Sequence, residues 1–264
     1  MKNYRKDRHY FLKYFAANAV VFTLLCLLLW RFMPVRPLHV SPWMLVLVPA
    51  GVLFGLVVST AFHNASHGNI KPRWLNTAIS ELAGAYTLEG MRNFRVGHAL
   101  HHRHSDDPRL DPHPPAGQSF GYFLLTSRGR TIACLKTLYY ESHGDTIASR
   151  RNIALQLVTF HVSLVAKVCF WWLLMGGAVF TLFFLPSYLA YFLGFGHLNW
   201  ISHLSDDDGK VRIKNHDGTL YYRVMNIITS GGYYHASHHK RPWLYNPSLG
   251  DRREAPLHRL PELS

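Results

Sequence analysis

The 264-residue sequence predicts an all-α integral membrane protein with four transmembrane helices. Hydrophobic residues make up 48% of the chain, and they gather in long runs with the charged residues between them. A helix needs about 20 apolar residues to cross the hydrocarbon core of a bilayer. Several runs reach that length, and no soluble fold requires them. We therefore expect the chain to span a membrane.

The spans follow from the apolar runs. The first run has a basic residue only near each end, and the second has no charge at all. The third extends from Asn152 to Leu198 with Lys167 as its one charged residue, which makes it long enough for two spans. The sequence "MGGA" at 175–178 offers a tight turn between them. The predicted helices are residues 11–32, 43–62, 153–174 and 178–198.

The basic residues predict the orientation. Of the 28 Lys and Arg residues, all but Arg31, Arg36 and Lys167 fall on one side of this topology, and that side is expected to be cytoplasmic. Both termini then lie in the cytoplasm. Basic segments beside a bilayer attract anionic headgroups, which explains the net charge of +13 without a nucleic-acid partner.

Ten of the 18 histidines lie in four short motifs. These are "HNASH" at 63–67, "HALHH" at 98–102, "HLNWISH" at 197–203 and "HASHH" at 235–239. The charge rule fixed the orientation without using the histidines, yet it places all four motifs on the cytoplasmic face. A cytoplasmic helical cap that holds a histidine-rich di-metal site is therefore expected.

Helical spacing selects among these histidines. Residues at i, i+3 and i+4 share one helix face, so His98, His101 and His102 fall within an arc of about 100° and can direct ring nitrogens at a shared metal. The "HASHH" motif repeats this arc, and the two histidines of "HNASH" lie about 40° apart. His104 falls outside the arc of its neighbours, which favours a supporting or loop role.

In "HLNWISH", Asn199 and His203 are four residues apart and share a helix face. His197 is six residues from His203 and points about 120° away from it, so His197 remains an outside candidate. His161, in the middle of the third predicted span, is interpreted as a hydrogen-bonded core residue. The surface or loop interpretation applies to His9, His39, His113, His143, His216 and His258.

Nine histidines are too many for a single metal of about four ligands, and they suit two metals. Imidazole binds zinc, copper, iron and nickel alike, so the ligand type does not select the metal. The chain has no Glu-x-x-His pair, which argues against a carboxylate-bridged site in a helix bundle.

The set HxxxH, HxxHH, NxxxH and HxxHH resembles the membrane fatty acid desaturase superfamily, and the resemblance runs from about residue 55 to about residue 245. The flanking sequences "HHRHSDDPRLDPHP" and "NIITSGGYYHASHH" resemble that family as well. Residues 1–264 are accordingly interpreted as a single desaturase-like domain. Box one departs from many acyl-CoA desaturases, because three residues rather than four separate its histidines.

The resemblance implies two iron ions that activate O2 and remove hydrogen from an unactivated C–H bond. It favours desaturation of an acyl chain of a lipid, with a hydroxylase or ketolase acting on a lipid, alkane or carotenoid as the alternative. Asn199 matches the position that holds a metal through a water. The implied metal ligands are His63, His67, His98, His101, His102, His203, His235, His238 and His239.

No haem-binding motif is fused to the chain, so electrons are expected from a separate donor of the ferredoxin or cytochrome b5 type. Groups that orient the metal ligands are also expected nearby. The candidates are Asp106, Asp107, Asp111, His104 and His197, together with Asp206, Asp207 and Asp208 in a segment that is otherwise a solvated turn.

A membrane metal or haem protein without catalytic activity is the rival of another class. Haem proteins of the membrane place histidine pairs inside the spans, whereas these motifs stand at span ends. A transporter would need polar residues through the bilayer core, and the first two spans offer almost none.

Overall fold

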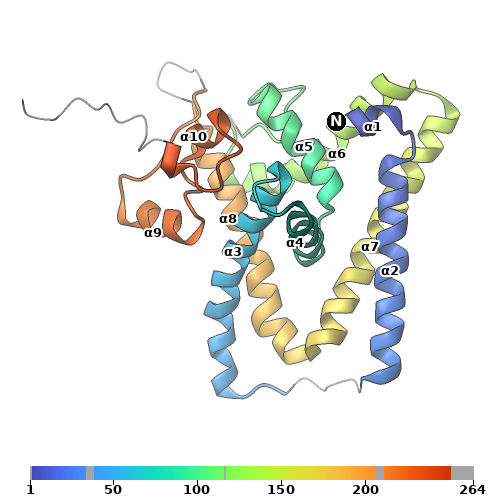
Figure 1. Ribbon diagram of the computed structural model, residues 1–264, viewed down its shortest axis with the longest axis vertical. Coiled ribbons are helices and arrows are strands. Elements are labelled where there is room, and N and C mark those ends of the chain that lie inside the picture. Colours follow the sequence, from blue (N-terminus) through green and yellow to red (C-terminus); the bar gives the residue numbers. More distant parts are fainter. Residues whose placement is uncertain (1, 34–38, 116, 206–210, 251–264) are drawn as a thin grey trace, which may run out of the picture.

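A computed structural model describes residues 2–33, 39–115, 117–205 and 211–250 (Figure 1). These residues form helices and two isolated β-bridges, and no strand is found among them. The α-helices are α1 (Lys2–Lys6), α2 (Tyr10–Phe32), α3 (Leu47–His67), α4 (Arg73–Tyr86), α5 (Met91–His104), α6 (Phe120–His143), α7 (Ile147–Val179), α8 (Leu185–Ser202), α9 (Leu220–Ile228) and α10 (His235–Lys240). A 3₁₀ helix (Pro42–Val46) leads into α3, and a π-helical turn (Phe180–Phe184) joins α7 to α8.

Three helical stretches of the described residues are long and apolar enough to cross a membrane, namely Tyr10–Phe32, Pro42–His67 and Ile147–Ser202. The third bends sharply at Gly176, where φ is 73° and ψ is 160°. Glycine adopts this left-handed region without steric cost. Figure 1 shows α7 and α8 as the two arms of a V that meet at this bend, with α2 beside α7 and α3 beside α8. The bend falls inside the turn predicted at 175–178.

The packing of α3 against α8 depends on glycine. A Cβ atom at Gly55 would collide with the backbone carbonyl oxygen of Ser187, and one at Gly51 would collide with that of Phe183. Small residues allow helices in a bilayer to approach this closely. This approach places the upper ends of α3 and α8, which carry histidines, side by side.

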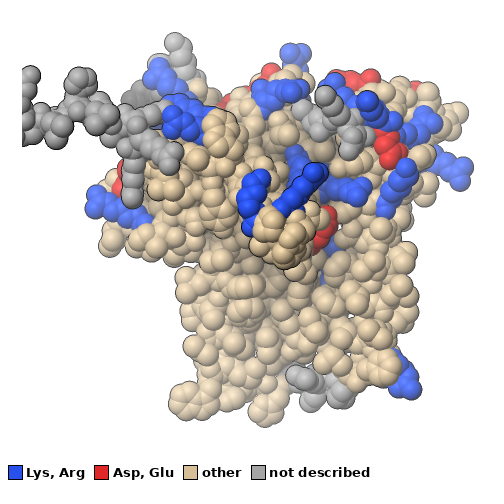
Figure 2. Space-filling model, viewed as in Figure 1, with Lys and Arg blue, Asp and Glu red and all other residues tan. Residues whose placement is uncertain are grey.

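Charged side chains gather at one end of the molecule. Figure 2 shows Lys, Arg, Asp and Glu over the upper part, whereas the arms below are almost entirely tan. The apolar side chains on the outer face of α2 are well exposed, as for Leu24 and Leu27, each 60% exposed. A lipid bilayer is the environment in which such exposure is favourable, so the fold is that of a membrane protein with its histidine-bearing segments at the charged end.

Candidate metal centre

Four helix ends bring the histidine motifs together. His63 and His67 lie in the last turns of α3, which stops at Gly68 in the left-handed conformation (φ 77°) that glycine favours. The "HALHH" motif occupies the last turns of α5, and His203 follows the last residue of α8. The third motif opens α10. Nine histidines, eight from the three boxes and His203, therefore converge from four elements.

Their ring nitrogens form two groups, and within each the ligand atoms lie within 4.8 Å of one another. The first histidine group contains His63, His67, His98, His102 and His238. The second histidine group contains His101, His203, His235 and His239. The rings of His102 and His239, one from each group, are 4.3 Å apart, so the two groups are adjacent.

This partition corrects one sequence prediction. The spacing suggested that each HxxHH triplet directs its three rings at a shared metal. Instead, His98 and His102 belong to the first group while His101 belongs to the second, and the α10 triplet divides in the same way. The arc of about 100° is wide enough for rings at its two edges to reach different centres.

The Nε2 atoms within each group face one another. Those of His98 and His102 are 3.0 Å apart, and those of His203 and His235 are 3.1 Å apart. Burial, and after it the neighbouring imidazoles, hold the pKa values of His98, His101, His235 and His238 well below the ordinary histidine value. The same causes lower the pKa of His102 to about 3. The rings are therefore neutral, which is the form that binds metals.

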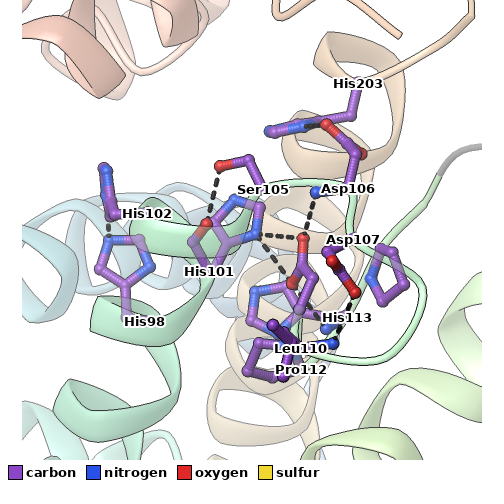
Figure 3. Close-up of polar contacts among 12 residues, drawn as sticks. His98, His101, His102, Ser105, Asp106, Asp107, Leu110, Pro112, His113 and His203 are labelled. Atoms are coloured by element: carbon purple, nitrogen blue, oxygen red, sulfur yellow. Dashed lines mark hydrogen bonds and ion pairs between the residues drawn. The ribbon is translucent and has the colours of Figure 1, made fainter.

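Two carboxylates contact the Nδ1 atoms of two histidines of the second group (Figure 3). His101 Nδ1 lies 3.1 and 3.0 Å from the two carboxylate oxygens of Asp111, which is itself buried. His203 Nδ1 lies 2.7 Å from Asp106 Oδ2. Each ring donates its Nδ1–H to the carboxylate and so leaves the Nε2 lone pair for a metal. Two of the predicted supporting residues thus contact predicted ligands.

The Asp106–Asp111 turn is braced by its own backbone. The backbone of Asp106 adopts a left-handed φ of 65°, a conformation that Asp tolerates better than most residues. Asp111 also accepts the backbone N–H groups of Asp106 at 2.8 Å and His113 at 2.9 Å. One buried carboxylate therefore fixes a ligand ring and two points of the loop at once.

The remaining supporting candidates lie elsewhere. Asp107 was predicted to orient a metal ligand, and this prediction is corrected. Its Oδ1 accepts the backbone N–H groups of Arg109 and Leu110 and so holds a turn rather than a histidine. His104 ends α5 and belongs to neither group. His197 also belongs to neither group, and its Nδ1 lies 2.8 Å from the hydroxyl of Tyr233. Asp206, Asp207 and Asp208 lie outside the described residues.

His113 is the site residue that the sequence interpretation missed. Its ring stacks on His101, with centroids 4.7 Å apart and an interplanar angle of 23°. His101, Asp111 and His113 together form a further cluster of potential metal ligands. His113 does lie in a loop, as expected, but the loop turns inward after Asp111 and its Nε2 is buried, so the residue is not a surface histidine. The position of His113 in "DPHP", two residues beyond Asp111, was the available signal.

The donor set fits bound transition metals. His101 Nε2 and Asn199 Oδ1 are buried and have no hydrogen-bond partner among the described residues. The amide nitrogen of Asn199 donates to Phe195 O, which leaves the oxygen as the group available at the site. Buried polar atoms normally have a partner, and converging neutral imidazoles suit iron, zinc, copper or nickel. Each group can thus hold one metal ion.

An apolar cavity of about 220 Å³ adjoins the histidines, with His98, His113 and Asn199 in its wall. One face of α6 lines it from Phe123 to Tyr139 at helical spacing, and 16 residues of helix correspond to about 24 Å. Phe192 of α8 lies at its wall and is 38% exposed. The cavity is therefore long, narrow and mostly apolar.

The chain matches a known protein family. Residues 41–264 match the family model described as Fatty acid desaturase. No curated protein and no solved structure matches the chain.

Proposed function

The chain belongs to the fatty acid desaturase family, and from this premise we propose that it is an O2-dependent di-iron oxidoreductase that desaturates an aliphatic acyl chain of a lipid. The observation that carries the proposal is the apolar cavity that runs along α6 and reaches the metal-site residues His98 and Asn199. An extended hydrocarbon chain fits its length and its mostly apolar lining.

The first and second histidine groups are proposed to hold one iron ion each. The proposed ligands are His63, His67, His98, His101, His102, His203, His235, His238 and His239, with Asn199 acting through a water. When bound, the iron would activate O2 and remove hydrogen from an unactivated C–H bond. A separate electron donor of the ferredoxin or cytochrome b5 type would supply the electrons, and the basic end of the molecule suits an acidic carrier.

Side chains around the histidines orient the proposed ligands and shape the cavity. Asp111 and Asp106 fix the tautomer and orientation of His101 and His203, so that their Nε2 atoms point inward. The aromatic walls of the cavity, including Phe94 and Phe195, exclude water from the neighbourhood of His98. The substrate chain is held by apolar contacts along α6, which place one of its C–H bonds beside the histidines.

The proposed topology has four crossings in a single domain, with α7 and α8 crossing separately on either side of Gly176. The charged end, both termini and the histidine groups then face the cytoplasm, as the excess of Lys and Arg on that side favours. A lipid chain would reach the cavity from the bilayer between α7 and α8, where Phe192 is exposed.

Lipid extracts from a host that produces the protein test this function. Extracts from cells with the intact protein should contain acyl chains two hydrogens lighter than those from cells with His102→Ala. A gain of one oxygen would favour a hydroxylase or ketolase instead. Identical lipids in the two hosts would refute the proposal.

A further inference from the structure

The helix α9 presents an apolar face that no described part of the chain covers. Leu220 is 78% exposed, Val224 45% and Ile227 80%, and none of the α9 residues is buried. At 100° per residue these three side chains share an arc of about 60°. Tyr221 and Arg223 stand on either side of that arc. An apolar stripe flanked by an aromatic and a basic residue is typical of helices that lie in a membrane interface.

The position of α9 in the fold selects the bilayer as its occupant. Figure 1 shows α9 beside the upper part of α3, far above the bend at Gly176 and close to the level of α4. Figure 2 shows that this is the level at which the tan arms give way to the charged end. The helix α9 thus lies at the depth at which the apolar surface of the arms ends. Amphipathic tyrosine and arginine side chains are favoured at that depth.

The opposite face of α9 holds the segment that leads into α10. The side-chain amide of Asn226 donates to His216 O at 2.8 Å, and its oxygen accepts the N–H of Tyr233 at 2.9 Å. The Asn226 carbonyl accepts the N–H of Gly231 at 2.7 Å. Tyr233 is fully buried and stands two residues before His235. The placement of the third histidine motif therefore depends on where α9 lies.

We propose that α9 is an interfacial helix that lies in the headgroup boundary of the bilayer and thereby holds the turn that carries His235, His238 and His239 in place. Membrane contact on one face and the Asn226 hydrogen bonds on the other connect the lipid surface to the histidine groups. This inference does not depend on the substrate or on the reaction.

Nitroxide labels measure the membrane contact. The protein is reconstituted in nanodiscs with a fraction of anionic lipid, after the three native cysteines are replaced by serine. Single labels are placed at Val224→Cys and Ile227→Cys. Leu24→Cys on the exposed face of α2 serves as the lipid reference and Glu141→Cys as the water reference. Accessibility to O2, relative to a nickel chelate, should be several-fold higher on α9 than at Glu141. Values equal to those at Glu141, or labels that neither reagent reaches because protein covers them, would overturn the proposal.

Cobalt retention measures the coupling to the histidines. Protein loaded with Co²⁺ in nanodiscs is dialysed against a chelator, and the retained metal is counted. The double variant Leu220→Ser/Ile227→Ser should lose cobalt affinity by about tenfold, the scale seen when groups supporting metal ligands are removed. Val21→Ser, a matched change on the exposed face of α2 (50% exposed), should retain cobalt as the parent does. Equal retention by the double variant and the parent would overturn the coupling.

Discussion

Replacing Asp111 by asparagine isolates the support of a single ligand ring. The carboxylate of Asp111 accepts the backbone N–H of Asp106 with one oxygen and that of His113 with the other, and His101 Nδ1 lies within 3.1 Å of both. An amide has only one oxygen. Whichever way it turns, its NH2 group faces one of the two backbone N–H donors, and that buried donor loses its partner.

The expected magnitude follows from this geometry. A buried donor left without a partner costs about 1–3 kcal/mol. Loss of a group that supports a metal ligand typically weakens metal binding about 10–100-fold, or roughly 1.4–2.7 kcal/mol. The two ranges agree. We therefore expect Asp111→Asn to weaken binding at the second histidine group by one to two orders of magnitude and to leave the first group nearly unchanged.

Cobalt titration of metal-free protein in nanodiscs, followed by the visible absorption of bound Co²⁺, measures this change. The matched control is Asp107→Asn, four residues away in the same loop, where the carboxylate holds only backbone N–H groups of the turn. The control should bind cobalt as the parent does. If Asp111→Asn also binds both equivalents with unchanged affinity, the proposed role of the Asp111 carboxylate is wrong.

Four further outcomes are expected. His102→Ala should abolish lipid oxidation and lower the bound metal, whereas His104→Ala should keep substantial activity; equal losses would show that the separation of α5 histidines into ligands and non-ligands is mistaken. The metal-free protein should lose stability as pH falls from about 6.5 toward the His102 pKa of about 3, because in that range the His102 imidazole gains a proton only in the unfolded chain. A melting temperature that increases when the pH is lowered from 7.5 to 5.5 would contradict this. Gly55→Ala should destabilise the fold by about 1–3 kcal/mol, since the added Cβ meets the α8 backbone. Gly121→Ala, where the added Cβ faces open space, should be nearly neutral, so the melting temperature should fall only for Gly55→Ala. Gly97→Phe, beside His98 in the cavity wall, should raise KM for long acyl chains more than for short ones, and a uniform loss of kcat would instead indicate damage to the histidine site.

The membrane helices were predictable because apolar runs report directly on burial in lipid. The first predicted span, 11–32, corresponds to α2 at Tyr10–Phe32, and the bend at Gly176 falls within the predicted turn. The convergence of the histidine motifs was expected from the predicted topology, since helix ends on one side of a bilayer would be confined to one layer.

The division of the histidines between two groups was not predictable from spacing. Helical periodicity gives the face of each ring, but the group it joins depends on how α3, α5, α8 and α10 approach one another. The sequence alone does not distinguish Asp106, Asp107 and Asp111, since all three follow the same histidine motif closely. The backbone turn decides which of their carboxylates contacts a histidine. The role of His113 could not be predicted for the same reason, because its stacking on His101 arises from the loop folding back.

Iron content per chain tests the central claim most directly. Protein purified from iron-supplemented cells and reconstituted in nanodiscs should hold two iron ions, one for each histidine group. His98→Ala, in the first group, and His235→Ala, in the second, should each hold about one ion. Wild-type protein that holds no iron, or the same iron content in the parent and in both variants, would contradict the assignment of these histidines to two metal sites.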